Sequence, residues 1–254
     1  MERIDVNEII LNNENVKIKK ENNIYELEFN TSNYELVNSL LKTRIIQGGS
    51  TDQTYKRIYF KADQIKTLKQ YKRDKKMTTG KNVLSVSDIA KLIRCLAIQL
   101  NYLIQKENCT ILGYNPEYIL VINDNIFAYI GNEVIEKIDE DTQCVMISCP
   151  HSTKDFFFST ELLTIKEIPA YIHFKSSYFS FGLLIIYALL EEDDFYSEYI
   201  NINNSINNSD PKKHNNPSTI LNVLNNHPIK NSKLYWLLSR CLVEDAKDRS
   251  IILI

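Results

Sequence analysis

Residues 87–130 read SDIAKLIRCLAIQLNYLIQKENCTILGYNPEYILVINDNIFAYI and contain the clearest structural pattern in the chain. After Ser87 and Asp88, apolar side chains recur at steps of three and four residues. They are Ile89, Leu92, Ile93, Leu96, Leu100 and Leu103. This spacing lays one apolar stripe along a helix, so we predict a long amphipathic helix packed into a core.

Two short apolar runs follow this helix, at residues 118–122 and 126–130. Between them lies Asn123-Asp124-Asn125, and Asn and Asp are frequent in tight turns because they tolerate left-handed backbone angles. A β-hairpin is therefore expected directly after the helix.

The N-terminal part alternates apolar and polar residues, which is typical of strands. Residues 16–18 and 24–29 predict two strands around a polar turn, and residues 44–47 and 55–60 predict two more. Ser32 and Glu35 form a capping-box pattern ahead of an apolar stripe, which predicts a short helix in between. Residues 1–64 are therefore expected to form a small lobe rich in β-sheet.

Residues 65–254 have mainly helical character. Apolar helices are expected near 178–190 and 233–243, after about thirty residues of weak periodicity that end at Glu161. Residues 201–217 are rich in Asn, Ser and Lys and are expected to form a flexible surface loop.

The composition of the chain limits its size as a folded unit and the kinds of partner that we expect. The 254 residues are 44% hydrophobic, enough for one large domain or for a small lobe fused to a larger one. A net charge of -2 creates no overall field toward nucleic acid or an anionic membrane, so neither is an expected partner. The abundance of Asn, Ile and Lys suggests an AT-rich genome, such as that of a large DNA virus or a parasite.

The expected location is intracellular, cytoplasmic or nuclear, in the host cell if the protein is viral. The five cysteines are odd in number and irregularly spaced, so no disulfide framework is expected. No secretory leader is visible, and the apolar run at residues 179–190 is shorter than the roughly twenty residues that span a bilayer.

Several local sequences, in order along the chain, resemble motifs of the protein kinase family. Residues 115–121, Asn-Pro-Glu-Tyr-Ile-Leu-Val, resemble Lys-Pro-Glu-Asn-Ile-Leu-Val of kinases, and 126–131, Ile-Phe-Ala-Tyr-Ile-Gly, resemble the strand that ends in Asp-Phe-Gly. Residues 158–163 are similar to the segment that ends in Ala-Pro-Glu, 177–182 to Asp-Val-Trp-Ser-Phe-Gly, and 241–249 to Cys-Leu-x-x-Asp-Pro-x-x-Arg. The resemblance implies an α+β, kinase-like two-lobe fold, with a reduced N-lobe over 1–64 and a helical C-lobe over 65–254.

The same alignment of motifs implies that the catalytic residues of kinases are missing. Gly113 lies where a kinase has its catalytic Asp, and Tyr118 lies where it has the Asn that binds the second metal ion. Tyr129 replaces the metal-binding Asp of Asp-Phe-Gly, whose glycine matches Gly131. We therefore assign no catalytic, cofactor-binding or metal-binding residue.

Nucleotide-binding features of kinases are also absent from the first strands. The first glycine is Gly48, so no glycine-rich loop can lie between the first two strands. The strand that leads into the first helix carries Glu26 and Glu28 where the resemblance would require a lysine.

Structural positions of the kinase family are retained in this sequence, although the catalytic residues are not. Glu161 and Arg249 match a buried structural ion pair of kinases. Phe156, Phe157 and Phe158 lie where a kinase receives its peptide, and they are either core or, if exposed, a docking patch. The resulting hypothesis is a pseudokinase, a catalytically inactive kinase-like domain that acts as a scaffolding or regulatory module and binds another protein, such as a kinase or signalling factor.

Two alternatives remain. In an atypical ATP-dependent Ser/Thr protein kinase, metal ligands would come from shifted positions, and the candidates are Asp124, Asp139, Glu140 and Asp141. The other alternative is a non-catalytic kinase C-lobe module that recruits other factors.

Other clusters favour simpler explanations. Cys144, Cys149 and His151 lack both a fourth ligand and zinc-finger spacing, so a zinc site is not expected. The basic segment around residues 66–76 could meet an acidic partner or nucleic acid, but a solvated helix face is the more frequent explanation. Its cations are Lys66, Lys69, Lys72, Arg73, Lys75 and Lys76.

Overall fold

The structure is a computed structural model, and it describes residues 8–21, 23–151, 155–197, 199, 224 and 227–251. The fold is of the α+β class, as predicted. The chain divides into two compact units. Unit 1 comprises Met1–Tyr71, Val86–Cys109 and Pro116–Ile135, and unit 2 comprises Lys72–Ser85, Thr110–Asn115 and Glu136–Ile254. The expected flexible loop at 201–217 lies outside the described residues.

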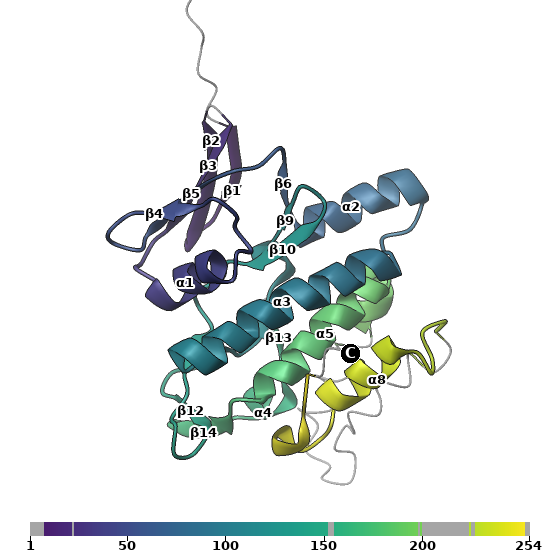
Figure 1. The fold of residues 1–254 in the computed structure, drawn as a ribbon. Helices are drawn as coiled ribbons and strands as arrows, with labels where there is room; N and C mark the ends of the chain where they lie inside the picture. The colour runs from purple at the N-terminus through teal and green to yellow at the C-terminus, as the bar shows by residue number, and fades with distance from the viewer. Residues whose placement is uncertain are drawn as a thin grey trace, which may run out of the picture. The chain divides into compact units, whose positions relative to one another are not determined.

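Unit 1 contains a five-stranded antiparallel sheet in the order β1-β2-β3-β5-β4 (Figure 1). The strands are β1 (Glu8–Asn12), β2 (Val16–Glu21), β3 (Ile24–Phe29), β4 (Ser50–Thr51) and β5 (Arg57–Lys61). Because side chains alternate along a strand, Tyr25, Leu27 and Phe29 are buried on one face while Glu26 and Glu28 lie on the other. The two predicted strands are therefore confirmed as β2 and β3, although Lys20 and Glu21, expected in the turn, belong to β2.

Helix α1 (Tyr34–Lys42) follows β3, as predicted, but its cap differs from the prediction. The N-cap is Asn33, whose Oδ1 accepts a hydrogen bond from the Leu36 N–H at 2.9 Å. Ser32 instead donates its hydroxyl hydrogen bond to the Thr54 carbonyl at 2.6 Å. The prediction that Ser32 and Glu35 form a capping box was therefore wrong.

The predicted strand at 44–47 was also wrong. Arg44 has a φ of 59°, a left-handed conformation that ends α1 and does not continue into a strand. Its N–H donates to the Leu41 carbonyl at 3.1 Å, and the N–H of Ile46 donates to the Leu40 carbonyl at 3.1 Å. These bonds fold the segment back onto the end of the helix, so Ile45 and Ile46 are buried in a turn.

A second sheet of unit 1 has three strands in the order β10-β9-β6. They are β6 (Ile65–Thr67), β9 (Ile119–Ile122) and β10 (Ile126–Tyr129), and the 3₁₀ turn η1 (Pro116–Tyr118) leads into β9. Asn123 and Asp124 both have a φ of 52°, the left-handed pair of angles that suits a tight hairpin turn. The predicted hairpin is confirmed.

The long helix predicted from the apolar stripe is α3 (Val86–Glu107) of unit 1. Ile89, Leu92, Leu96, Leu100 and Leu103 are all buried, so this prediction is confirmed.

Unit 2 is built around α5 (Ser176–Leu189), whose side chains are buried almost all round. Gly182 permits close packing with α8 (Lys233–Cys241), because a Cβ added there would lie 3.1 Å from Cys241 Cβ and 3.1 Å from Leu242 Cδ2. Both helices match the predictions. Other elements in the described part of unit 2 include β8 (Gly113–Tyr114), β12 (Cys144–Ile147), β13 (Phe157–Phe158), α4 (Thr160–Leu163), β14 (Ala170–His173) and η3 (Ala246–Asp248).

Three elements continue from one unit into the other along the chain. They are α2 (Leu68–Thr79), β7 (Cys109–Ile111) and β11 (Ile135–Lys137).

Lys72, expected on a solvated helix face, is instead fully buried in unit 2. Its ammonium donates hydrogen bonds to the carbonyls of Tyr187 and Leu190, at 3.0 Å for Leu190, and lies 3.8 Å from the centroid of the Tyr187 ring. These carbonyls belong to the end of α5, where helix carbonyls need donors. Lys72 therefore caps α5, which the sequence pattern of α2 alone did not reveal.

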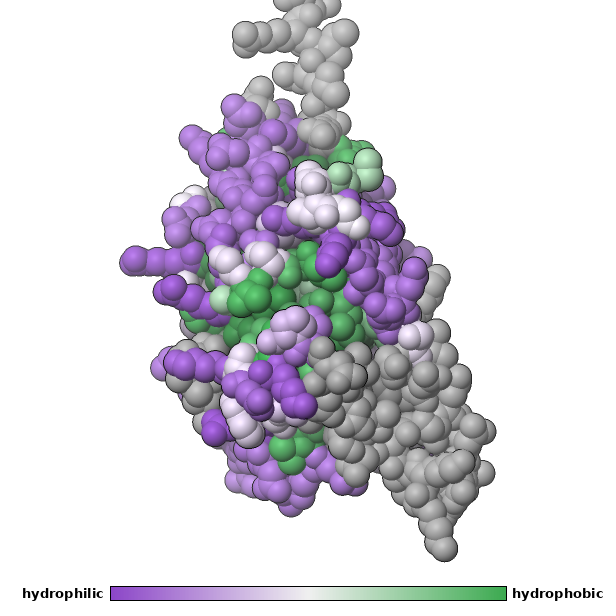
Figure 2. Space-filling view, turned by 90° about the vertical axis from the view of Figure 1, so that its right-hand side faces the viewer, coloured by the Kyte–Doolittle hydropathy of each residue, from purple (hydrophilic) through white to green (hydrophobic). Residues whose placement is uncertain are grey.

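The described surface carries several large apolar side chains as well as polar ones. Figure 2 shows one face, on which hydrophobic residues gather near the middle among hydrophilic ones. Large apolar side chains that are exposed include Met77, Met146, Ile168, Tyr171 and Trp236. Among the described helices, none is long and apolar enough to cross a lipid bilayer.

Candidate functional site

Tyr118 and Tyr129, the two tyrosines singled out in the sequence, come together around Gly131 in unit 1. The Ile130 N–H donates to the Tyr118 carbonyl at 2.9 Å, which holds the end of β10 beside η1. A Cβ added at Gly131 would lie 2.6 Å from Tyr129 Oη and 3.2 Å from Tyr118 Cδ2. Only a residue without a side chain leaves room for both rings, so the two rings and Gly131 form one packed unit.

The polar edge of this unit is a chain of side-chain hydrogen bonds. Tyr118 Oη donates to Glu133 Oε1 at 2.8 Å, and Asn15 Nδ2 lies 3.5 Å from the same phenol oxygen. Asn30 Nδ2 donates to Asn15 Oδ1 at 3.1 Å, and Asn132 Nδ2 donates to Thr31 Oγ1 at 3.1 Å. The turn between β1 and β2 is thereby connected to the segment that follows β10.

Burial raises the pKa of the Tyr118 phenol, and the carboxylates of Glu133 and Glu14 raise it further. The phenol therefore stays protonated at neutral pH. It acts as a hydrogen-bond donor toward Glu133 and not as a base.

Gln99 supports the two rings from α3. Gln99 Nε2 donates to the Tyr129 carbonyl at 2.8 Å, and the Tyr129 N–H donates to Gln99 Oε1 at 3.0 Å. The same amide nitrogen donates to Ser39 Oγ of α1 at 3.1 Å. Sequence reasoning missed Gln99, although a polar residue inside an apolar helical stripe was the available signal.

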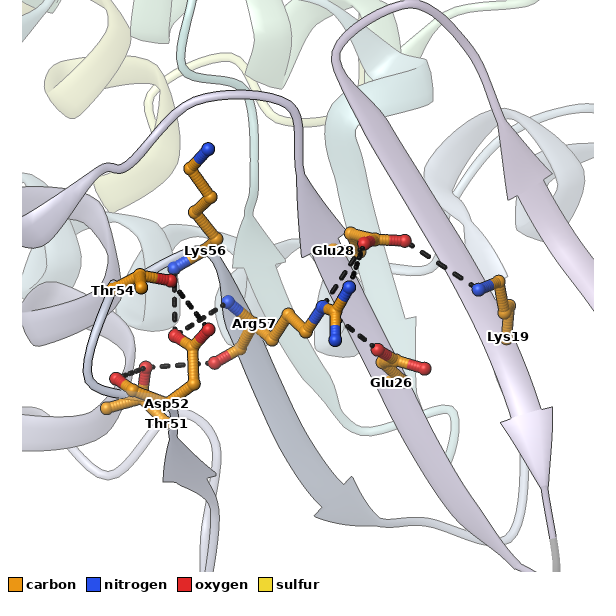
Figure 3. Close-up of polar contacts among 8 residues, drawn as sticks. All are labelled: Lys19, Glu26, Glu28, Thr51, Asp52, Thr54, Lys56 and Arg57. Carbon is orange, nitrogen blue, oxygen red and sulfur yellow. Dashed lines mark hydrogen bonds and ion pairs between the residues drawn. The ribbon is translucent and has the colours of Figure 1, made fainter.

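Opposite charges cover the solvent-facing side of the five-stranded sheet (Figure 3). Arg57 donates to Glu28 Oε1 at 2.7 and 3.1 Å and lies 3.4 Å from Glu26 Oε1, while Lys19 lies 3.7 Å from Glu28 Oε2. The hydrogen bond from Arg57 lowers the pKa of Glu28, against the raising effect of burial. Glu26 and Glu28, noted in the sequence in place of a lysine, are therefore partners of Arg57 on a neighbouring strand.

A shallow groove of about 430 Å³ lies beside these charges, between the β1–β2 turn and the loop that precedes β5. Asp52 organises that loop by accepting hydrogen bonds from Thr54 Oγ1 at 2.6 Å and from the Lys56 N–H at 3.0 Å (Figure 3). The hydrogen bond from Thr54 lowers the pKa of Asp52. Since Asp52 and Glu28 already serve neighbouring groups, the groove offers mainly amides, lysine amines and the Glu14 carboxylate to a ligand.

In unit 2 the structure brings Glu161 and Arg249 together. Arg249 is fully buried and donates both terminal nitrogens to the Glu161 carboxylate, at 3.2 Å for the longer bond. It also donates to the carbonyls of Val243 at 2.7 Å and Glu244 at 2.9 Å. Its guanidinium carbon also lies 4.9 Å from the centroid of the Phe179 ring. Arg249 therefore connects α4, which contains Glu161, to the segment that follows α8 through a fully engaged charge.

The docking patch proposed for Phe156, Phe157 and Phe158 is wrong, because all three side chains are at least 96% buried. Phe158 packs on Gly113, where an added Cβ would lie 2.4 Å from Phe158 Cε1. Tyr199 Oη donates to the Phe156 carbonyl at 3.2 Å and accepts from the Phe158 N–H at 3.3 Å. These phenylalanines are core, which was the other interpretation of the run.

An apolar groove of about 300 Å³ lies next to this core in unit 2. Phe158 and His151 both line it, and His151 Nε2 lies 3.7 Å from Glu136 Oε1. Burial lowers the pKa of His151. The other apolar residues that line the groove are Ile147, Pro150, Leu162, Leu163, Ile165 and Ile168.

The acidic residues considered as shifted metal ligands do not form one cluster. Asp139 Oδ1 accepts hydrogen bonds from Thr142, at 2.8 Å from its N–H and 2.7 Å from its hydroxyl, whereas Asp124 lies in the β9–β10 turn of the other unit. Within the described part of the chain, no three His, Cys, Asp or Glu side chains are grouped so that they could hold a metal ion.

Comparison with known proteins adds no identification. No family model matches the sequence, and no curated protein matches it.

Proposed function

We propose that this chain is a protein-kinase-like domain that does not transfer phosphate and that acts by binding another protein. The observation that carries the proposal is the packing of Tyr118 and Tyr129 around Gly131. By the resemblance of the motifs, these tyrosines stand where a kinase places its two metal-binding side chains. Aromatic rings there supply bulk and a neutral phenol in place of oxygen ligands for magnesium.

The order of elements in unit 1 supports the kinase-like part of the proposal. A small antiparallel sheet with one helix after its third strand is followed by β6, α3 and the β9–β10 hairpin. In unit 2, the ion pair between Glu161 and Arg249 occurs at the two positions that the motif resemblance assigns to it.

The composition and hydrogen bonding of the β1–β2 turn support the proposal that the chain does not bind nucleotide. In kinases this turn is glycine-rich and covers the phosphates. Here it carries Asn13, Glu14 and Asn15, and Asn15 is hydrogen-bonded to Asn30 and lies beside Tyr118. A loop held in this way is poorly suited to enclose a triphosphate.

The protein-binding part of the proposal is supported by the apolar groove of unit 2. Leu162 and Leu163 line it, and Ile168 at its rim is 47% exposed. A groove of this size accepts one or two apolar side chains of a partner.

Thermal unfolding in the presence of Mg-ATP tests whether the chain lacks nucleotide binding, as the proposal requires. We expect no stabilisation at millimolar Mg-ATP, whereas a ligand at one hundred times its dissociation constant would add about 2.7 kcal/mol. A parallel assay with radiolabelled ATP should show no transfer to the chain or to a generic protein substrate.

The outcome that favours an atypical kinase is equally specific. It is a magnesium-dependent stabilisation together with phosphate transfer that disappears in Asp124→Asn or Asp139→Asn. Asp155→Asn is the matched control, because Asp155 is exposed and its φ of 64° also suits Asn.

A further inference from the structure

The second half of α2 carries an exposed face that the proposed function does not use. Arg73, Lys76 and Met77 are all exposed and are spaced by three and four residues, so they share one side of the helix. Met77 is 87% exposed. Lys81, just after the helix, is exposed as well.

The opposite side of the same segment is firmly attached to unit 2. Lys72 binds the carbonyls at the end of α5, as described above. After the helix, the Asn82 N–H donates to both oxygens of Glu191 at 3.0 Å, and the Leu84 N–H donates to the Ala188 carbonyl at 2.9 Å. The exposed face is therefore held in place before any partner arrives, which reduces the ordering cost of binding.

Helix stability explains only part of this arrangement. Lys76 lies in the last turn, where a cation interacts favourably with the helix dipole. Arg73 and Lys76 repel each other at a spacing of three residues, and neither has an ion pair to a carboxylate in the described part of the chain. Met77 is almost fully in water, beside Arg73 and Lys76 and one turn from the exposed Asp74, and it has no role in the fold of this helix.

We propose that Arg73, Lys76, Met77 and Lys81, here called the α2 basic face, form a docking surface for an acidic segment of a partner protein. The segment would place carboxylates against Arg73 and Lys76 and one large apolar side chain on Met77. The Arg guanidinium holds a carboxylate through two parallel hydrogen bonds, and Met adapts to apolar partners of different shape. The chain as a whole has a net charge of -2, so the attraction for acidic groups is local to such clusters.

Met77 favours a protein over nucleic acid. A phosphate backbone would engage the cations but would leave the thioether in water, whereas a peptide with alternating acidic and apolar residues covers both. This inference depends on the proposed function only in taking the partner to be a protein. The nucleotide tests above do not involve α2, so the two proposals fail independently.

Fluorescence anisotropy with a designed peptide tests the docking surface. The probe is a labelled synthetic peptide in which Asp and Glu alternate with Leu, and a second peptide has every Leu replaced by Ser. We expect the leucine peptide to bind the full chain and to bind at least about tenfold more tightly than the serine peptide. Arg73→Glu with Lys76→Glu should weaken binding by about tenfold or more, and Met77→Ser by severalfold, about three to ten.

The control is Lys61→Glu with Lys230→Glu, which makes the same change in charge at two other exposed positions. It should leave the dissociation constant within about twofold, since neither position belongs to the α2 basic face and exposed charges outside a contact are screened by salt. Arg73→Gln with Lys76→Gln, a milder pair, should also weaken binding and guards against unfolding of the charge-reversed chain. Equal weakening by the control, absence of peptide binding, or tighter binding of a short DNA duplex or of phosphatidylserine vesicles overturns the proposal.

Discussion

The side-chain amide of Gln99 pairs with both backbone groups of Tyr129. The Tyr129 N–H donates to Gln99 Oε1 at 3.0 Å, and Gln99 Nε2 donates to the Tyr129 carbonyl at 2.8 Å. Gln99 belongs to α3 and is fully buried, so one side chain of the helix supplies the hydrogen bonds that another strand would otherwise give to β10. The position of the Tyr129 ring over Gly131 therefore depends on a residue thirty positions earlier in the chain.

Replacing Gln99 by Leu should destabilise the protein strongly. The change keeps the apolar stripe of α3 but leaves the buried N–H and carbonyl of Tyr129 without partners, at about 1–3 kcal/mol for each group. We expect a loss of about 2–4 kcal/mol in the free energy of unfolding. Urea titration followed by circular dichroism measures it. Gln105→Leu, at an exposed position of the same helix, should change stability by less than about 0.5 kcal/mol.

Gly113→Ala should disturb the core of unit 2. An added Cβ would lie 2.4 Å from Phe158 Cε1, and the buried ring has little room to move. Overpacking of this kind costs about 1–3 kcal/mol, measured as a shift of the urea midpoint. Phe158→Leu alone should also destabilise the protein. In the double variant, however, the loss of stability should be smaller than the sum of the losses in the two single variants. Strict additivity would mean that the two residues do not press on each other.

The elements predicted correctly are those whose signal is local. The stripe of α3 and the Asn123-Asp124 turn of the hairpin report geometry that a few neighbouring residues determine. The wrong strand at 44–47 shows the limit of this reasoning. Ile45 and Ile46 are buried, as they would be in a strand, but the left-handed conformation of Arg44 turns them back under the end of α1. Their sequence has no feature that distinguishes a buried strand from a buried turn.

Long-range contacts account for most of what the sequence did not reveal at the site. The motif resemblance singled out Tyr118, Tyr129 and Gly131, and the structure places them together. The support from Gln99 and the connection of Asn15 to Asn30 join residues that are far apart in the chain, so local patterns cannot predict them. The prediction that Lys72 lies on a solvated helix face was wrong for a related reason. The spacing of residues along α2 does not show which of its cations faces the end of α5.

Arg249→Ala should be one of the most damaging substitutions in unit 2. It removes a buried charge that binds Glu161 and two backbone carbonyls, and breaking a buried pair from one side costs about 3–5 kcal/mol. Glu161→Gln should cost less, because the amide oxygen still accepts a hydrogen bond from Arg249 and the guanidinium keeps its bonds to the carbonyls of Val243 and Glu244. A double-mutant cycle in urea should give a coupling energy above about 1 kcal/mol. A coupling near zero would contradict the structural role of the pair.

Lys72 should make the stability of the protein depend on pH at alkaline values. Burial lowers the pKa of its ammonium to about 8 from the ordinary 10.5. Between these two values the unfolded chain holds a proton on Lys72 that the folded chain has largely released. Raising the pH removes this advantage of the unfolded state, so the contribution of Lys72 to folding improves from pH 8 upward and reaches its full value above pH 10.5.

Comparison with Lys72→Met isolates this effect from the titration of other groups, because Met keeps the apolar length of the side chain and cannot ionise. The free energy of unfolding of the wild-type chain should rise relative to the variant by up to about 3 kcal/mol across this pH range. Urea titrations at several pH values from 7 to 10 measure the difference. A difference that stays constant with pH would mean that the carbonyls of Tyr187 and Leu190 compensate the ammonium fully, so that its burial carries no net penalty.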